Sequence, residues 1–362
     1  MITPALALST DQKVDVSKIE KSLADLWRME NENEEFAVTR AALWNVVAHT
    51  SSSDHHAEAS ETLGRASASV PQRTIVVRAD PSAVADMSSW ISANCHILGG
   101  GKQVCSEQIA IVAGGDHIHR VPPLVRALLL PDMPVAVWWL GDLPNEHEEY
   151  VESLLEPADR LIVDSVHFDS PADISLVARV SEQTTTTPAD LNWVRLEEWR
   201  TATASIFDPP HMRERLSTVA RLRVVAATGE EEFFGHSVQS LLFASWISGQ
   251  LEHHVDREGK VEGRRGAIEY RFERARGSAD IGGIALVEMV FEDGSVATVT
   301  RDRELCVLTT NVDGLVSTPD SVTRTLAQLT PELIIRQLKR PEGDRILAKV
   351  LPIAARMAGR VA

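Results

Sequence analysis

The chain has 362 residues, more than one hydrophobic core usually serves, so two domains are expected. Its hydrophobic content of 44% and charged content of 24% are those of an ordinary globular protein. The formal net charge of −16 disfavours a nucleic-acid or membrane-surface partner, because the protein would repel phosphate groups. Three cysteines are too few for a disulfide framework, and we find no signal peptide and no apolar run long enough to span a membrane. We therefore expect a cytoplasmic protein.

The N-terminal part of the chain combines helical and strand patterns. Apolar spacing predicts, in order, a helix over 16–33, a strand over 43–47, a polar loop over 51–56, a helix over 57–69, and strands over 74–78, 92–97 and 104–112.

Three consecutive glycines, Gly99 to Gly101, separate the last two of these strands. They predict a β-hairpin, since such turns need the positive φ that glycine adopts freely. The spacing around them fits neither the dinucleotide-binding fingerprint nor the phosphate-binding loop of nucleotide hydrolases.

Cys95 and Cys105 lie at equal sequence distances from Gly100. A hairpin that is symmetric about Gly100 places them directly opposite each other, with Cα atoms about 4.5 Å apart in a non-hydrogen-bonded pair, within disulfide range. We expect a pair that oxidation can join. A shift of register by one residue would separate the two side chains onto opposite faces, and cysteine is also a common buried filler.

The pattern from residue 119 onward predicts a βαβ unit. Pro122 and Pro123 fit the first turn of a helix over 121–130, where proline is tolerated. A continuous apolar strand over 135–140, a helix over 145–155 and a strand over 161–163 follow, and such strands are parallel and buried on both faces. Trp138 and Trp139 then point to opposite faces of the sheet, and both are expected in the core.

The stretch from Phe207 to Pro210, with two consecutive prolines, is the strongest candidate for a domain boundary within the chain. It predicts an N-terminal α/β domain over 1–208, with a mostly parallel sheet in its βαβ part, and a C-terminal α+β domain over 209–362, with an antiparallel sheet. The expected elements of the second domain are helices near 212–219 and over 236–249, and strands over 222–227, 268–273, 284–291, 295–300 and 305–309.

Two carboxylates are candidate ligand groups. Asp142 and Asp164 each follow an expected parallel strand, at the edge where α/β sheets bind ligands. They could hold a metal ion or serve in acid–base chemistry. Short acidic residues are also frequent in loops that lead into helices, and we favour this plainer explanation.

His117 and His119 would share one face of a strand, but no third ligand lies at a useful spacing. We therefore expect neither a metal site nor a cofactor.

Several tryptophan-rich blocks between about residues 70 and 210 resemble the signature of the OpcA family. The blocks are His119-Arg120-Val-Pro122-Pro123-Leu124-Val125, Leu128-Leu-Leu-Pro131-Asp132-Met-Pro134, Trp138-Trp139-Leu-Gly141, Ala158-Asp159-Arg160-Leu-Ile-Val-Asp164-Ser165, Asp190-Leu-Asn-Trp193-Val-Arg195, Trp199-Arg200 and Phe207-Asp208-Pro209.

The resemblance implies a partner of glucose-6-phosphate dehydrogenase that promotes the assembly and activity of that enzyme in the oxidative pentose phosphate pathway, and it brings no catalytic residues. Cyanobacterial members carry cysteines near the C-terminal end that make them sensitive to thioredoxin. This chain has only Cys306 in its second half, so that mechanism does not carry over.

Two classes of function thus remain. The first is a non-catalytic regulatory protein whose partner is glucose-6-phosphate dehydrogenase. The second is an α/β enzyme or sensor that binds a phosphosugar or nucleotide through Asp142 and Asp164. The sequence leaves the contact surface and self-association open.

Overall fold

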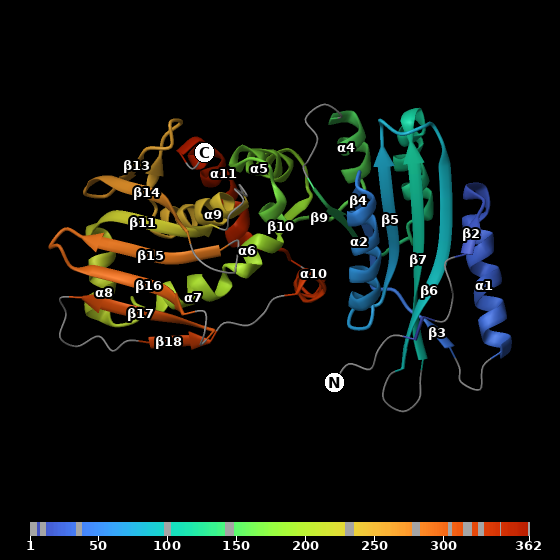
Figure 1. Ribbon diagram of the computed structural model, residues 1–362, viewed down its shortest axis with the longest axis horizontal. Helices are drawn as coiled ribbons and strands as arrows, with labels where there is room; N and C mark the ends of the chain where they lie inside the picture. The colour runs from blue at the N-terminus through green and yellow to red at the C-terminus, as the bar shows by residue number, and fades with distance from the viewer. Residues whose placement is uncertain are drawn as a thin grey trace. The chain divides into compact units, whose positions relative to one another are not determined.

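The computed structural model in Figure 1 describes most of the chain. The described residues are 6–7, 12–33, 38–97, 103–141, 148–228, 235–276, 283–302, 306–313, 321–324, 329–340 and 342–360. Two compact units are present: unit 1 consists of Met1–Val163 and Leu329–Gly343, and unit 2 of Asp164–Gln328 and Asp344–Ala362. Within the described residues, no helix is both long and apolar enough to cross a membrane.

Unit 1 is built on a mixed sheet with the strand order β1-β6-β7-β5-β4-β8-β9. Its strands are β1 (Leu6–Ala7), β2 (Gln12–Val14), β3 (Val38–Arg40), β4 (Trp44–Thr50), β5 (Gln72–Asp80), β6 (Met87–Ile97), β7 (Gln103–Gly114), β8 (Val135–Trp139) and β9 (Arg160–Val163). Its helices are η1 (Val16–Lys18), α1 (Ile19–Asn33), α2 (Ser53–Ala66), η2 (Gly115–Arg120), α3 (Val121–Leu128), α4 (Glu148–Leu155) and α10 (Thr330–Leu338).

The centre of this sheet is parallel, because β7, β5, β4, β8 and β9 all run in one direction. The predicted βαβ unit is confirmed as β8–α4–β9. All five residues of β8 are buried, and Trp138 and Trp139 are each 2% exposed, as expected for a strand covered on both faces.

Helix α10 returns to unit 1 from a distant part of the chain and packs against α2. The guanidinium group of Arg160, at the start of β9, donates hydrogen bonds to the carbonyl oxygens of Gln337 and Arg340. These carbonyls lie at the C-terminal end of α10, where helix carbonyls lack partners within the helix, so Arg160 completes the hydrogen bonding of that end.

Several expected element boundaries in unit 1 are wrong; strand β6, for example, was expected from residue 92 and begins at Met87. Helix α2 begins at Ser53, inside the predicted polar loop, because the Ser52 side chain accepts hydrogen bonds from the backbone amides of Asp54 and His55 and caps the helix. Helix α3 ends at Leu128, before the predicted residue 130. The glycine turn at 99–101 lies outside the described residues, as does the expected start of α4 at residue 145.

Unit 2 contains the second sheet, with the strand order β12-β13-β14-β11-β15-β16-β17-β18. The strands of this sheet are β11 (Val219–Thr228), β12 (His254–Val255), β13 (Val261–Gly263), β14 (Gly266–Arg276), β15 (Gly283–Phe291), β16 (Val296–Asp302), β17 (Val307–Asp313) and β18 (Ser321–Arg324). The short strand β10 (Thr187–Asp190) also lies in unit 2 but is not part of this sheet. The helices of unit 2 are η3 (Ser165–His167), η4 (Pro171–Asp173), α5 (Ile174–Gln183), α6 (Leu191–Arg195), α7 (Glu197–Ser205), α8 (Pro210–Arg215), η5 (Leu216–Thr218), α9 (Gly235–Gln250), α11 (Arg345–Met357) and η6 (Ala358–Arg360).

An antiparallel sheet was predicted for unit 2, and this prediction is wrong for one pair of strands. Strand β14 pairs with β11 in parallel, whereas β15 to β18 pair as an antiparallel meander. The chain leaves β11 through α9 and returns through the β12–β13 hairpin, and this long crossover brings β14 back in the same direction.

The core of unit 2 lies where α9 and α11 pack against each other and α9 packs on the sheet. Leu241, Leu242 and Phe243 of α9 and Leu347 and Leu351 of α11 are fully buried. Residues 164–208 group with unit 2 in this division. The expected division into domains 1–208 and 209–362 stays a prediction.

Candidate functional site

The two candidate carboxylates have different outcomes. Asp142 lies outside the described residues. Asp164 follows β9 as predicted, and its two carboxylate oxygens accept hydrogen bonds from the Arg195 guanidinium at 2.6 and 2.8 Å. Its side chain is 9% exposed. A carboxylate in such a two-point ion pair is held in place and largely withdrawn from solvent.

Asp190, directly before α6, is a buried carboxyl group close to Asp164. Its oxygens accept hydrogen bonds from the Ser165 amide, the Ser165 hydroxyl and the Asn192 amide at 3.0, 2.6 and 2.9 Å. Burial, and then the charge of Asp164, raise its pKa to about 6, although these hydrogen bonds act the other way. Asp190 therefore orders the start of α6 and the turn after β9.

The remaining polar groups around α6 also have structural partners. The Trp193 indole donates a hydrogen bond to Asp344, the N-cap residue of α11, at 2.8 Å. The Arg200 guanidinium lies over the Trp193 ring, 3.4 Å from its centroid, and donates to the Trp193 carbonyl oxygen. The Asn192 carboxamide bonds to Ser165 and to Gln239 of α9. The polar side chains around α6 thus hold neighbouring elements of unit 2 together.

In unit 1, aromatic rings fill the region at the carboxyl end of β4. His49 stacks on Trp139 with ring centroids 4.0 Å apart, and its centroid lies 5.5 Å from that of Tyr150. Burial lowers the pKa of His49 to about 3, so this imidazole is neutral. Neither of its ring nitrogens has a hydrogen-bond partner among the described residues.

The structure brings no metal site together within the described part of the chain: no three His, Cys, Asp or Glu side chains there gather as a metal ion requires. His117 and His119 do not lie on a strand, where they would share a face. Both belong to η2, where residues two apart do not share a face.

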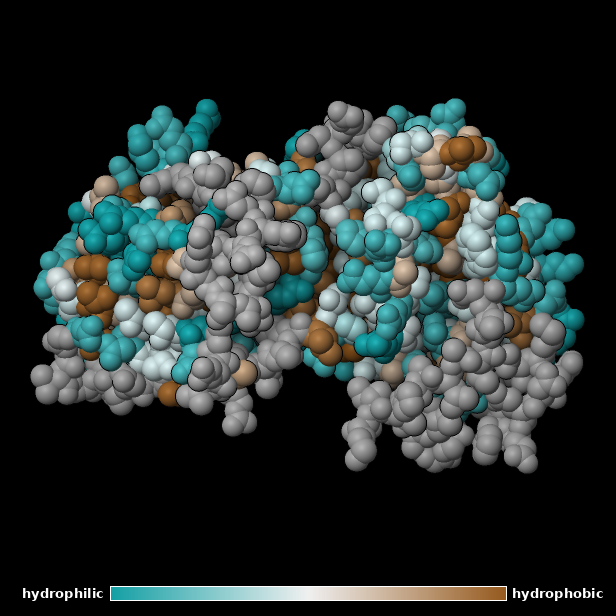
Figure 2. Space-filling view, in the orientation of Figure 1, coloured by the Kyte–Doolittle hydropathy of each residue, from teal (hydrophilic) through white to brown (hydrophobic). Residues whose placement is uncertain are grey.

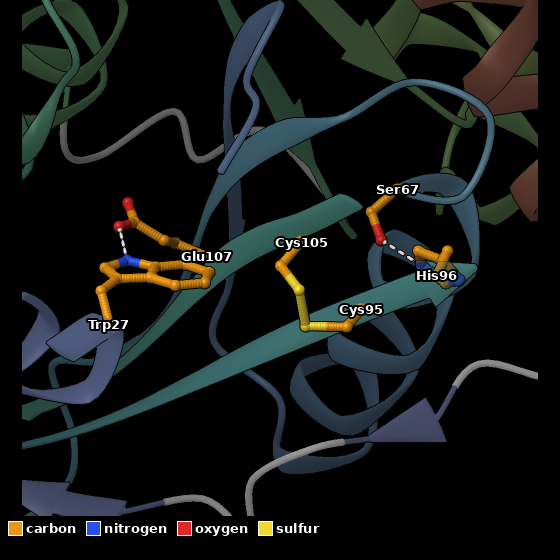
Figure 3. Close-up of a disulfide and its surroundings, with 6 residues drawn as sticks. All are labelled: Trp27, Ser67, Cys95, His96, Cys105 and Glu107. Carbon is orange, nitrogen blue, oxygen red and sulfur yellow. Dashed lines mark hydrogen bonds between the residues drawn. A yellow bond between two sulfur atoms is a disulfide. The ribbon is translucent and has the colours of Figure 1, made fainter. Parts of the chain in front are cut away.

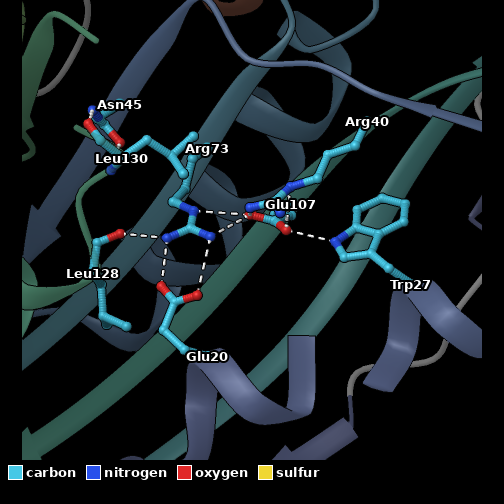
Figure 4. A network of polar contacts seen from close by, with 8 residues as sticks. All are labelled: Glu20, Trp27, Arg40, Asn45, Arg73, Glu107, Leu128 and Leu130. Carbon is cyan, nitrogen blue, oxygen red and sulfur yellow. Dashed lines mark hydrogen bonds and ion pairs between the residues drawn. The ribbon is translucent and has the colours of Figure 1, made fainter. Parts of the chain in front are cut away.

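A buried charge network lies on the opposite end of unit 1, between α1 and the sheet (Figure 4). Arg73 of β5 and Glu107 of β7 form an ion pair at 2.7 Å, and each side chain is 2% exposed. Arg73 also bonds to Glu20 of α1 at 2.6 Å and to the Leu128 carbonyl oxygen at 2.7 Å. Breaking a buried pair of this kind costs about 3–5 kcal/mol, because one charge is left uncompensated.

The Glu107 carboxylate also accepts contacts from two other side chains. The Trp27 indole of α1 donates to it at 2.5 Å, and the partly exposed Arg40 pairs with it at 2.8 Å. Two side chains of α1, Glu20 and Trp27, therefore end on one buried ion pair. A cavity of 340 Å³ lies beside Arg40, Arg73 and Glu107.

The predicted cysteine pair lies next to this network. Strands β6 and β7 place Cys95 opposite Cys105 with a Cα separation of 4.0 Å, and a disulfide joins them (Figure 3). The two residues are 2% and 0% exposed. They share an apolar cluster with Ala93 and with Leu26 and Trp27 of α1. On the other face of the hairpin, His96 bonds to Ser67 after α2 at 3.0 Å. Whether the pair responds to redox conditions stays a prediction.

Sequence reasoning missed Arg73 and Glu107. The available signal was a charged residue at an inward position of a strand that is otherwise apolar, as in the runs RTIVV and SEQIAIV. A charge at such a position needs a buried partner of opposite sign.

The surface seen in Figure 2 shows no large apolar patch of described residues that would mark a functional site. On the face seen in Figure 2, apolar residues of the described parts form separate groups among polar ones. Such scattered apolar residues are normal for a protein surface.

Two family models match the chain, and they describe the two domains of one "Glucose-6-phosphate dehydrogenase subunit". The model of the N-terminal domain matches residues 64–179, and the model of the C-terminal domain matches residues 186–351. The two matches together span most of the chain.

Curated relatives are similar over a smaller region. The "Putative OxPP cycle protein OpcA" of Synechocystis sp. is 33% identical over 150 residues, which is 41% of this chain and 30% of the relative. The protein of the same name from Synechococcus elongatus is 30% identical over 167 residues, covering 46% of this chain and 36% of the relative. The matched region is therefore about a third of the length of these relatives. Among solved structures, levoglucosan dehydrogenase is similar with a TM-score of 0.49 at 11% identity, covering 89% of this chain and 97% of that one.

Proposed function

The chain belongs to the OpcA family of glucose-6-phosphate dehydrogenase subunits, and from this membership we propose that it is a non-catalytic assembly factor and allosteric activator of a glucose-6-phosphate dehydrogenase. The observation that carries the proposal is the pair of family matches over residues 64–179 and 186–351. The proposed setting is the oxidative pentose phosphate pathway in the cytoplasm.

The geometry around Asp164 supports a role without catalysis. A general base must reach the proton that it abstracts, directly or through one water molecule. Asp164 is instead held in its ion pair with Arg195, and Asp190 accepts three hydrogen bonds from its own unit. Both carboxyl groups are engaged in positioning the protein's own elements.

An activator of this kind must bind one state of its target more tightly than another. A coupling free energy of about 1–3 kcal/mol changes the apparent affinity of the enzyme for its substrate 5- to 150-fold. No covalent chemistry is required of the activator.

The test is to titrate this protein into its purified cognate dehydrogenase. We expect a lower apparent KM for glucose-6-phosphate, or a shift of the enzyme to a larger active oligomer in analytical ultracentrifugation. An unrelated acidic protein at equal concentration is the control. Unchanged kinetics and unchanged oligomer size at saturation would reject the proposal.

The alternative is a phosphosugar- or nucleotide-binding enzyme or sensor that uses Asp142 and Asp164. It predicts turnover or saturable binding of such a ligand by this protein alone. Loss of that signal in Asp142→Asn or Asp164→Asn, with the fold retained, would establish it. Because Asp164 is bound to Arg195, an Arg195→Lys variant should alter any such signal as well.

A further inference from the structure

The disulfide between Cys95 and Cys105 is covered by helix α1. Both cysteines are buried, and Leu26 and Trp27 of α1 pack in the same apolar cluster. A thiol reagent must reach one of the two sulfur atoms to exchange with the disulfide. Leu26 and Trp27 of α1 form part of this cover, so movement of α1 would open an approach to the sulfur atoms.

Among the described residues, α1 is held by buried apolar side chains, such as Ile19 and Leu23, and by two polar contacts to the sheet. Glu20 bonds to Arg73 and Trp27 bonds to Glu107, and Arg73 and Glu107 pair with each other beneath the helix. Figures 3 and 4 show Trp27 on its bond to Glu107, beside the disulfide in one view and within the charge network in the other. The same indole therefore contributes to the apolar cover and to the polar anchor.

We propose that Cys95–Cys105 is a site of thiol–disulfide exchange with dithiol reductants, and that α1 is the cover that gates it. A thiolate of the reductant attacks one cysteine sulfur and forms a mixed disulfide, and the other cysteine leaves as a thiolate. The second thiol of the reductant then displaces the first cysteine. Two electrons and two protons pass to the pair, and the reductant ends as a disulfide.

The coupling runs in both directions. After reduction, two sulfur atoms that no longer share a bond separate to van der Waals contact, about 3.5–4 Å. Beneath a closely packed cover this added volume disfavours docking, as overpacking does in any core. Docked α1 therefore favours the disulfide, and by linkage reduction favours release of α1.

The first test measures how fast dithiothreitol reduces the disulfide in the full chain, by alkylation and mass spectrometry. If opening of α1 precedes exchange, the rate follows the fraction of open molecules. Glu20→Gln and Trp27→Phe each weaken one anchor, and each should speed reduction about 5- to 30-fold.

Asp25→Asn is the matched control, because Asp25 lies on the same helix and pairs with Arg28 of α1 itself. Its rate should equal that of the unaltered protein. Glu20 is half-exposed, with 53% of its side chain accessible, so Glu20→Gln should fold even where Trp27→Phe does not.

The second test compares amide exchange of α1 in the oxidised and reduced protein and in Cys95→Ala/Cys105→Ala. Protection of residues 19–28 should fall on reduction, while protection of β4 stays high. Equal reduction rates in Glu20→Gln and Asp25→Asn, or equal α1 protection in both redox states, would overturn the proposal. No dehydrogenase enters either test, so the outcome is independent of the proposed function.

Discussion

The environment of the Asp190 carboxyl group shifts its pKa in two opposite directions. Complete burial and the nearby charge of Asp164 favour its neutral form, whereas the hydrogen bonds from Ser165 and Asn192 favour its ionised form. Burial prevails, and the pKa is raised to about 6. The folded protein therefore binds a proton at Asp190 at a pH where the unfolded chain has already released it.

The first prediction concerns the pH dependence of stability at this residue. Because the pKa is raised in the folded state, the contribution of Asp190 to stability is fully present below the unfolded pKa near 4 and is lost as pH rises through about 6. Asp190→Asn does not titrate. The free energy of unfolding of the unaltered protein, relative to the variant, should fall by about 2 kcal/mol between pH 4.5 and pH 7. Urea unfolding at both pH values measures this difference.

Asp293→Asn is the control for this measurement. Hydrogen bonds from Ser295 and then from Arg215 lower the pKa of Asp293 to about 2, so its contribution is constant between pH 4.5 and pH 7. A difference between the unaltered protein and Asp190→Asn that does not change with pH would contradict the first prediction.

Some residue-level features could be predicted from the sequence. The opposition of Cys95 and Cys105 follows from local symmetry about Gly100, and the position of Asp164 follows from the strand before it. The partner of Asp164 could not be predicted, since Arg195 lies 31 residues away and only the tertiary fold brings the two together. The Arg73–Glu107 pair could not be predicted for the same reason, because the two residues are 34 positions apart in the sequence.

At the scale of elements, α2 shows where local signals compete. Ser52 caps the helix from within a run of polar residues that equally suits a loop. The parallel pairing of β11 and β14 could not be predicted either, because the direction of pairing depends on the crossover between them. The short strand β10, which contains a proline, gave no strand pattern at all.

The second prediction concerns Gly64, in the last turn of α2. A glycine there costs the helix about 0.5–1 kcal/mol relative to alanine. A Cβ at this position would lie 3.5 Å from the Asn94 carboxamide oxygen, an ordinary contact. Gly64→Ala should therefore raise the free energy of unfolding by about 0.5–1 kcal/mol, measured by urea denaturation.

Gly114→Ala is the contrasting variant. A Cβ at Gly114, at the end of β7, would collide with the carbonyl oxygen of Val84. This substitution should lower stability, because the neighbouring backbone must shift. If Gly64→Ala is also destabilising, the space beside α2 is smaller than the structure indicates.

At the scale of the whole molecule, the chain forms two compact units. The mixed α/β class, the presence of two sheets and the βαβ unit could all be predicted from apolar periodicity. Periodicity carries no information about which distant segments join the same core, and so it did not anticipate that Leu329–Gly343 belongs to unit 1.

The third prediction tests whether the two units unfold independently. Leu351 of α11 is fully buried in unit 2, and Leu351→Asp would place an unpaired charge there. Amide exchange should show loss of protection in β11 and β15, while β4 and β5 of unit 1 keep theirs. Ile346→Asp, at a position of the same helix that is 46% exposed, should leave both units protected. Simultaneous loss in both units would mean that they unfold as one.

The return of α10 to unit 1 has a consequence for synthesis on the ribosome. The 165 residues from Asp164 to Gln328 are translated between the two segments of unit 1. At roughly 5–20 residues per second, this interval lasts about 8–33 s. During that time the side of α2 that α10 will cover, and the guanidinium of Arg160, have no partner from the later segment, so the nascent unit exposes a surface that chaperones can bind. A ribosome that stalls anywhere in this interval would carry an unfinished unit 1, however completely its first 163 residues had been made.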